Sequence, residues 1–259
     1  MNNFNAIITI AARDLTKLLR DRGRMIASLA FPLIFIGILG SSMQSNIGDD
    51  IGYNFLTFVF IGVIGQTLFQ STAGGLISLI EDKQNDFSQE LFISPVSRYA
   101  IVFGKILGET LVSFVQILGV LIFAFIFRVP FDLGMLVSLF PFAFLTAILG
   151  GSFGLLVMAN MSDQRAANQL FPFLLFPQFF LAGVFNPIKI LPLPLMILSR
   201  IAPMTYAVDL LRSIYYWNSP AYEKTVLFSP LTNIIVVVAF SVIFLVLGTY
   251  MFVRNERNK

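Results

Sequence analysis

The sequence predicts an all-α polytopic membrane protein with six transmembrane helices, on two observations. Of the 259 residues, 57% are hydrophobic and only 12% are charged, whereas a water-soluble domain is about 25% charged. Six stretches contain no Lys, Arg, Asp or Glu: Met25–Gly48, Ile51–Ile80, Thr110–Phe127, Leu133–Ser162, Ala166–Ile188 and Thr225–Val253. A helix needs about 20 apolar residues to cross a bilayer, and these stretches are too long for the strands of a membrane barrel.

We therefore expect one transmembrane domain over residues 1–259. Its elements are an interfacial helix at 1–23, spans near 25–45, 55–80, 103–127, 134–159, 167–188 and 228–253, a short cytoplasmic helix at 82–93, and re-entrant or outer helices at 190–217. The spans leave no room for a soluble catalytic domain. Without Cys or His, no disulfide, thiolate metal site or imidazole proton shuttle is expected.

The basic residues predict the orientation. Of the 17 Lys and Arg residues, five fall in the expected outer connectors: Arg128, Lys189, Arg200, Arg212 and Lys224. The remainder lie on the other side, as the positive-inside rule requires. We expect a multi-pass protein of the plasma (cytoplasmic) membrane with both termini in the cytoplasm. The net charge of +3 reflects this topology and does not indicate nucleic-acid binding.

The segment before the first span has the period of an amphipathic helix. Its apolar residues recur at steps of three and four: Phe4, Ile7, Ile8, Ala11, Leu15, Leu18 and Leu19. Arg13, Lys17 and Arg20 occupy another face. This pattern favours a helix in the membrane interface; the alternative is a plain positive-inside anchor.

A short helix is also predicted in the connector after the second span. Acidic residues cluster at its start, where a helix dipole favours them. Pro95 disfavours helix at Ser94, so we expect the helix to end near Ile93. Phe87, Leu91 and Phe92 give it an apolar side away from lipid, which suits docking to a partner. A solvated loop is the alternative.

Prolines break the segment before the last span into short pieces. Residues 190–199 are apolar but too short to cross a bilayer, so they are expected to be re-entrant or interfacial. We expect Thr205 to cap a helix that begins at Tyr206. On that helix Asp209 and Arg212 are spaced to form an ion pair. An outer loop with an aromatic anchor is the alternative.

Polar residues inside the spans allow two interpretations. Five of them are candidates to line a pathway: Gln66, Gln70, Ser113, Gln116 and Gln178. Hydrogen bonds between helices would explain them equally well. At the start of the third span, Lys105 and Glu109 lie one turn apart, so we expect them to pair near the interface.

Taken in order, three groups of residues resemble the membrane subunit of type-2 ABC exporters. The first is the amphipathic segment that leads through Arg20-Asp21 into Phe31-Pro32. The second comprises Gln89-Glu90-Leu91, Ser94-Pro95-Val96-Ser97-Arg98 and Gly104-Lys105. The third comprises Gly183, Phe185, Pro187, Pro192, Pro203, Thr205, Tyr206, Asp209 and Arg212. The resemblance covers essentially the whole chain.

This resemblance implies a translocation pathway driven by a separate ABC ATPase subunit, with a second copy of the chain or a close paralogue completing the transporter. ATP and Mg would bind to the ATPase, and no cofactor to this chain, which has no G-x-x-x-x-G-K-[ST] motif. The implied ATPase-coupling residues are Phe87, Glu90, Leu91, Phe92, Pro95, Arg98, Asp163 and Arg165. The implied outer gate comprises Gly183, Pro187, Pro203, Thr205, Tyr206, Asp209 and Arg212.

Three functions remain open from the sequence. Abundant Phe and the amides in the spans favour a drug- or lipid-like cargo, while polysaccharide or glycolipid export is the alternative within the same class. A channel or secondary transporter is the rival from another class, but the spans contain no clear buried charges or internal repeats. A membrane enzyme is disfavoured because His is absent and the acidic residues lie in connectors.

Overall fold

The computed structural model describes residues 3–84, 96–161 and 163–257, and this part of the chain forms helices and no strands. The α-helices are α1 (Asn3–Arg20), α2 (Arg22–Leu33), α3 (Ser41–Ile51), α4 (Phe55–Gly75), α5 (Ser78–Gln84), α7 (Arg98–Ile126), α8 (Leu133–Met158), α9 (Gln164–Leu181), α10 (Leu193–Ile201), α11 (Pro203–Tyr215), α12 (Tyr222–Thr225) and α13 (Pro230–Arg257). A π-helix, η1 (Ile34–Gly40), joins α2 to α3, and a 3₁₀ turn, η2 (Ile188–Ile190), precedes α10. The predicted fold class is confirmed.

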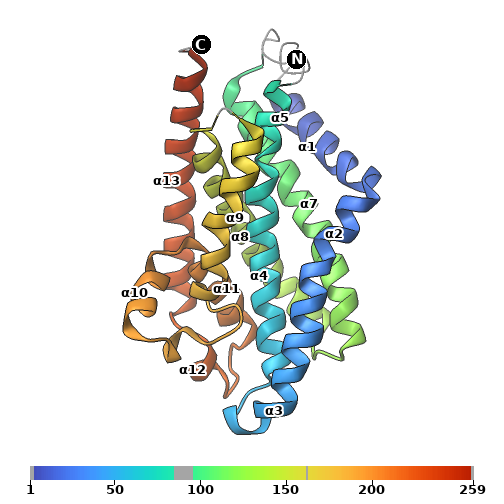
Figure 1. The fold of residues 1–259 in the computed structure, drawn as a ribbon, viewed down its shortest axis with the longest axis vertical. Coiled ribbons are helices and arrows are strands. Elements are labelled where there is room, and N and C mark those ends of the chain that lie inside the picture. Colours follow the sequence, from blue (N-terminus) through green and yellow to red (C-terminus); the bar gives the residue numbers. More distant parts are fainter. Residues whose placement is uncertain (1–2, 85–95, 162, 258–259) are drawn as a thin grey trace.

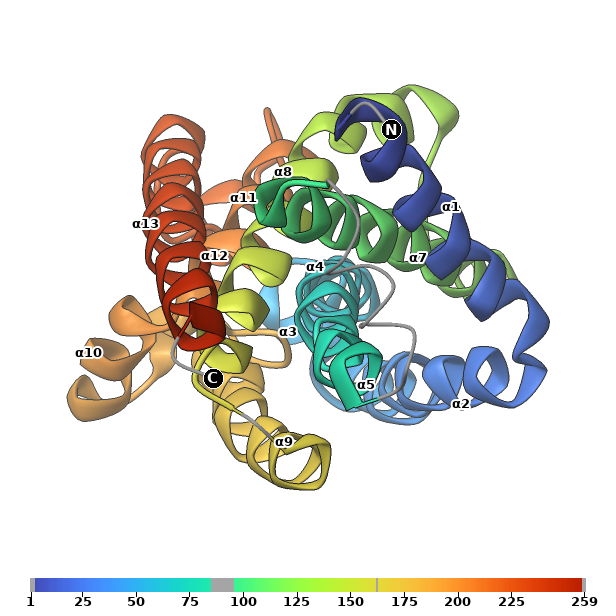
Figure 2. The same cartoon turned by 90° about the horizontal axis from the view of Figure 1, so that it is seen from above.

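The long helices form a bundle with two chemically different ends. The start of α1 and the last turn of α13 lie at the same end of the bundle, called here the terminal end (Figure 1). Helices α10, α11 and α12 lie at the opposite end (Figure 1). Viewed from above, α1 crosses the edge of the bundle beside α7 (Figure 2). Because the chain begins and ends at one end, it traverses the bundle an even number of times.

Five helical segments of the described chain are long and apolar enough to cross a membrane: Met25–Asn46, Phe55–Asp82, Arg98–Ile126, Leu133–Met158 and Tyr222–Asn255. A sixth candidate is the pair α10 and α11, which is bent by 90°. The expected fifth span, 167–188, corresponds to α9, which is less apolar because Gln164, Arg165, Asn168 and Gln169 occupy its first turns. Helix α9 nevertheless runs along the bundle from the terminal end toward α10 and α11 (Figure 1). That it crosses a membrane stays a prediction.

Helix α4 is the centre of the bundle and is buried over most of its length. It begins at the cap residue Asn54, whose side chain accepts a hydrogen bond of 2.8 Å from the Thr57 backbone N–H. Neighbouring helices approach it closely where glycines replace side chains. A Cβ atom added at Gly154 of α8 would lie 2.8 Å from the Ala73 Cα atom, and one at Gly65 would lie 3.2 Å from the Val208 Cα atom. Small residues at such crossings allow backbones to approach closely in membranes.

The first span is not a regular α-helix. Pro32 lies inside α2, and the π-helical segment η1 follows directly. Proline lacks a backbone donor and displaces the carbonyl one turn earlier, so the hydrogen-bond ladder changes there. Phe35 of η1 stacks on Phe185 with ring centroids 4.5 Å apart, which ties this segment to the turn after α9. The π-helix was not expected from the apolar pattern.

Substituting the glycine at the α4–α8 crossing tests this packing. Gly154→Ala should destabilise the protein by about 1–3 kcal/mol, because the new methyl group meets backbone rather than a movable side chain. The measurement is the midpoint of thermal unfolding in detergent. Gly74→Ala is the matched control, since its Cβ atom would lie 3.7 Å from the Phe171 ring, an ordinary contact. A lower midpoint for Gly74→Ala than for Gly154→Ala would contradict the packing described here.

Candidate functional site

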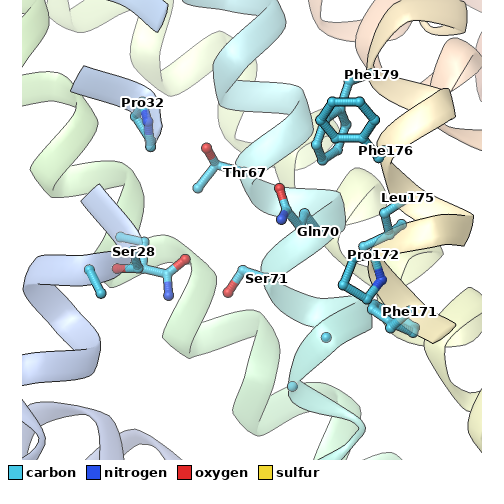
Figure 3. A pocket seen from close by; sticks show the side chains of 14 residues that line it. Ser28, Pro32, Thr67, Gln70, Ser71, Phe171, Pro172, Leu175, Phe176 and Phe179 are labelled. Atoms are coloured by element: carbon cyan, nitrogen blue, oxygen red, sulfur yellow. The ribbon is translucent and has the colours of Figure 1, made fainter. Parts of the chain in front are cut away.

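A cavity of about 460 Å³ opens between α2, α4, α7 and α9 (Figure 3). Its lining residues are Ala27, Ser28, Pro32, Thr67, Gln70, Ser71, Gly74, Gly75, Gln116, Phe171, Pro172, Leu175, Phe176 and Phe179. Thr67, Gln70 and Ser71 project from α4 in the middle of the view, with α2 on one side and α9 on the other (Figure 3). The volume lies within the range of about 300–1,000 Å³ that small-molecule sites occupy.

The two walls of the cavity differ in chemistry. Helix α4 supplies a hydroxyl-rich and amide-bearing wall, to which Gln116 of α7 and Ser28 of α2 add. Helix α9 supplies an apolar wall built from Phe171, Leu175, Phe176 and Phe179 (Figure 3). No Lys, Arg, Asp or Glu occurs among the described lining residues. The cavity can therefore hold an apolar body and a few hydrogen-bonding atoms.

The five polar residues proposed from the sequence divide into two groups. Gln70 and Gln116 line the cavity. The other three are buried and form hydrogen bonds: Gln66 donates to Gln70 Oε1 over 3.4 Å, Ser113 donates to the Thr110 carbonyl over 2.7 Å, and Gln178 Oε1 accepts from the Met204 N–H over 3.4 Å. Only the bond of Gln178 joins two helices, α9 and α11, whereas Gln66 and Ser113 bond within α4 and α7. The Phe wall of α9 was not singled out from the sequence.

An ionic network joins three helices at the terminal end of the bundle. The Lys105 ammonium of α7 lies 2.9 Å from Asp14 Oδ1 of α1 and 3.2 Å from Asp82 Oδ2 of α5. Arg13 donates two hydrogen bonds to the Asp82 carboxylate, of 2.8 and 3.1 Å. A further pair, Lys17 and Glu81, lies 3.2 Å apart at the surface. The amphipathic helix is thus attached to the first turns of the expected coupling segment.

Burial determines which of these charges depend most strongly on their partners. The Lys105 and Asp14 side chains are 2% and 3% exposed. Burial raises the pKa of the Asp14 carboxyl, although the nearby Lys105 ammonium opposes this shift. The pKa of Arg13 is raised, mainly by its hydrogen bond to Asp82. An ionised Asp14 therefore depends on Lys105 as its counter-charge.

Sequence spacing led us to expect Lys105 to pair with Glu109. Its ammonium instead lies beside the carboxylates of Asp14 and Asp82, which are far away in the sequence. The sequence did contain one indication that Asp14 faces α7. Asp14 follows Ala11 by three residues and precedes Leu18 by four, so it falls on the face of α1 that is buried against α7.

The residues expected to couple the chain to an ATPase are described only in part. Phe87, Glu90, Leu91, Phe92 and Pro95 lie outside the described residues, as does most of the helix expected at 82–93. The remaining three lie within the described residues. Arg98 begins α7, Asp163 caps α9 by accepting from the Arg165 and Ala166 N–H groups, and Arg165 is exposed.

At the opposite end, Asp209 and Arg212 are both buried, but they do not pair. Asp209 accepts hydrogen bonds from the Leu227 and Phe228 N–H groups and from the Asn233 amide, at 2.8–2.9 Å. The Arg212 guanidinium donates to the Phe58 and Val184 carbonyls over 3.3 and 3.0 Å and lies 3.6 Å above the Phe58 ring. No ion pair between the two is present in the described chain. Their i, i+3 spacing suggested a pair, but each side chain finds partners on other elements.

The other residues of the implied outer gate also lie at this end. Gly183 has a φ of +70°, a conformation that favours glycine, and Pro187 leads into η2. Helix α11 begins at Pro203 after Ala202, so the expectation that Thr205 caps it is wrong. Proline suits the first helical position because no donor is needed there. Thr205 instead donates to the Leu181 carbonyl over 3.4 Å, and Tyr206 donates to the Arg200 carbonyl over 2.8 Å.

Comparisons with known proteins find relatives of this chain among transport proteins. The sequence profile of the family described as ABC-2 type transporter matches residues 5–216. The chain is 30% identical to the inner membrane transport permease YadH of Escherichia coli over 186 residues, which cover 70% of each chain. It is 24% identical to the putative transport permease ycf38 of Cyanophora paradoxa over 229 residues, 85% of this chain and 77% of the relative. ABC transporter G family member 20 of Dictyostelium discoideum is 30% identical over 139 residues, 53% of this chain and 19% of the relative.

Removing the buried ammonium tests the ionic network. Lys105→Met should cost about 3–5 kcal/mol of stability because it leaves the Asp14 carboxylate buried without its counter-charge. Lys17→Met, which removes an exposed pair, should cost no more than about 1 kcal/mol. Thermal unfolding in detergent measures both. Lys105→Met combined with Asp14→Asn should recover part of the loss; no recovery would contradict the assigned pairing.

Proposed function

The chain belongs to the ABC-2 type transporter family, and we propose that it is the membrane subunit of an ATP-driven exporter. A separate ABC ATPase subunit supplies the energy. The chain itself has no phosphate-binding loop of the G-x-x-x-x-G-K-[ST] type. The family and its transport permeases support a membrane transport role for this multi-pass protein.

The cargo is a hydrophobic or amphipathic molecule, drug-like or lipid-like, that passes through the cavity between α4 and α9. The observation that carries this proposal is the contrast between the two cavity walls. Phe171, Phe176 and Phe179 receive an apolar body, while Gln70 and Gln116 orient a few polar atoms. A polysaccharide would require many more hydrogen-bonding groups along a continuous path. The absence of charge from the described lining also disfavours an inorganic ion as the cargo.

A second copy of the chain, or a close paralogue, completes the pathway beside α9. This helix carries exposed aromatic and aliphatic side chains next to the cavity, namely Leu170, Phe173, Leu174, Phe176 and Phe180. Lipid molecules can cover these side chains, but lipid alone would leave the polar wall of α4 facing hydrocarbon. A polar wall in hydrocarbon is costly. A protein partner therefore suits this face better.

The ATPase docks at the terminal end, on the segment that follows α5. Phe87, Leu91 and Phe92 provide the apolar contact, while Glu90 and Arg98 form pairs at its rim. Burying one aromatic side chain contributes about 1.5–3 kcal/mol, and an exposed ion pair contributes about 0–1 kcal/mol. The apolar residues therefore dominate docking. Asp163 and Arg165 offer a second, smaller contact at the same end of the bundle. This end faces the cytoplasm, where ATP is available.

The docking proposal is tested by truncating the apolar residues of the connector. Phe87→Ala with Leu91→Ala should abolish co-purification with the ATPase, because two buried side chains are lost from the contact. The matched control is Phe125→Ala with Leu118→Ala, a pair that is exposed on α7 away from this connector. Unchanged recovery of the ATPase with the Phe87/Leu91 variant would refute this docking site. Failure of the unmodified chain to bind any ATPase would refute the exporter itself.

The cavity proposal is tested by filling it. In lipid vesicles that contain the complex, amphipathic compounds should stimulate ATP turnover by the unmodified protein. Ser71→Trp should remove at least about nine-tenths of this stimulation, because a large ring displaces the cargo from the polar wall. A tenfold loss of cargo affinity corresponds to about 1.4 kcal/mol of binding free energy. Val242→Trp, on the exposed face of α13, should keep the stimulation. Equal stimulation of both variants would exclude the cavity as the pathway.

A further inference from the structure

A second hollow lies at the terminal end, away from the cavity described above. It is a groove of about 660 Å³ between the start of α7 and the last turns of α13. Tyr99 and Phe103 form one side, and Leu245, Val246, Thr249, Tyr250, Val253 and Arg254 form the other. We refer to these eight residues as the α7–α13 groove. None of them belongs to the ionic network or to the cavity wall.

Within residues 3–84, 96–161 and 163–257, the charged and phenolic groups of this groove have no partners. Arg254 and the hydroxyls of Tyr99 and Tyr250 form no hydrogen bond or ion pair with any residue in the described ranges. The lining contains one positive charge and no acidic side chain. Tyr99 and Tyr250 are about three-fifths exposed. An unpaired guanidinium beside two free hydroxyls suits a phosphate group.

The length of the groove matches one leaflet of a bilayer. Arg254 lies at the end of the segment Tyr222–Asn255, which is long and apolar enough to cross a membrane. Leu245 lies nine residues earlier, which is about 14 Å along an α-helix. Half of a hydrocarbon core of about 30 Å is a similar distance. The polar groups therefore sit where headgroups lie, and the apolar part of the groove extends along one acyl chain.

We propose that the α7–α13 groove binds one phospholipid of the surrounding membrane that has an anionic headgroup. The phosphate contacts Arg254 and the two tyrosine hydroxyls, and an acyl chain lies against Phe103, Leu245 and Val246. Basic pockets between helices on the cytoplasmic side are known to select anionic headgroups. A second copy of this chain fits the groove less well, since it would have to pair Arg254 with an acid. At this end Asp14, Asp82 and Glu81 are already in ion pairs, Asp163 caps α9, and Asp21 also has an interaction partner.

Native mass spectrometry of the delipidated full-length chain tests this site. Titration with dioleoyl phosphatidylglycerol should give one saturable adduct at lower concentrations than dioleoyl phosphatidylcholine, whose choline cancels the charge of the phosphate. Arg254→Gln should weaken the phosphatidylglycerol adduct about fivefold, the effect of one charge worth about 1 kcal/mol near a membrane surface. Arg22→Gln is the matched control, because this arginine is exposed at the start of α2 and does not line the groove. It should leave the adduct unchanged.

A second variant separates lipid from protein as the occupant. Val246→Trp fills the groove from an exposed position and should weaken the adduct while leaving the oligomeric state as it is. Loss of a dimer with Val246→Trp, with lipid binding intact, would show that a second copy occupies the groove and would overturn the proposal. Equal binding of the two lipids, or equal losses with Arg254→Gln and Arg22→Gln, would overturn it as well.

Discussion

The structure depends on the burial of α4, a helix that neighbouring helices surround over most of its length. In hydrocarbon there is no hydrophobic force to press helices together, so such a helix is held by close contact. Gly62 and Gly65 on α4 and Gly150 and Gly154 on α8 remove the side chains that would prevent this contact. The same burial allows Gln66 to lie inside the bundle, where its amide finds Gln70 rather than lipid.

Charged residues occur at the two ends of the bundle, and at each end they join elements that are distant in sequence. At the terminal end Lys105 links α1 and α5 to α7. At the opposite end Asp209 binds the chain that enters α13, and Arg212 binds carbonyls of α4 and of the turn after α9. A buried charge is costly unless every partner is in place. Each cluster therefore specifies one arrangement of its helices.

The sequence was sufficient for most of the spans and insufficient for the contacts between them. Charge-free stretches predict α4, α7, α8 and α13, because the cost of burying charge in lipid acts on each residue separately. The partners of Lys105, Asp209 and Arg212 depend on which helices become neighbours, and local spacing suggested the wrong ones. The π-helix η1 and the phenylalanine wall of α9 likewise reflect packing. The burial of Asp14 could have been predicted, because this acidic residue lies on the apolar face of α1.

The cavity and the ionic network lie on one nearly continuous helical segment, Phe55–Asp82, which comprises α4 and α5. Gln70 lines the cavity, and Asp82 binds Arg13 and Lys105 about 18 Å further along, at 1.5 Å per residue. The turn at Leu76 and Ile77 is the place where this segment departs from a regular α-helix. Because Arg13 of α1 and Lys105 of α7 both bind Asp82, the ionic network ties α5, and with it the end of the segment that lines the cavity, to two further helices.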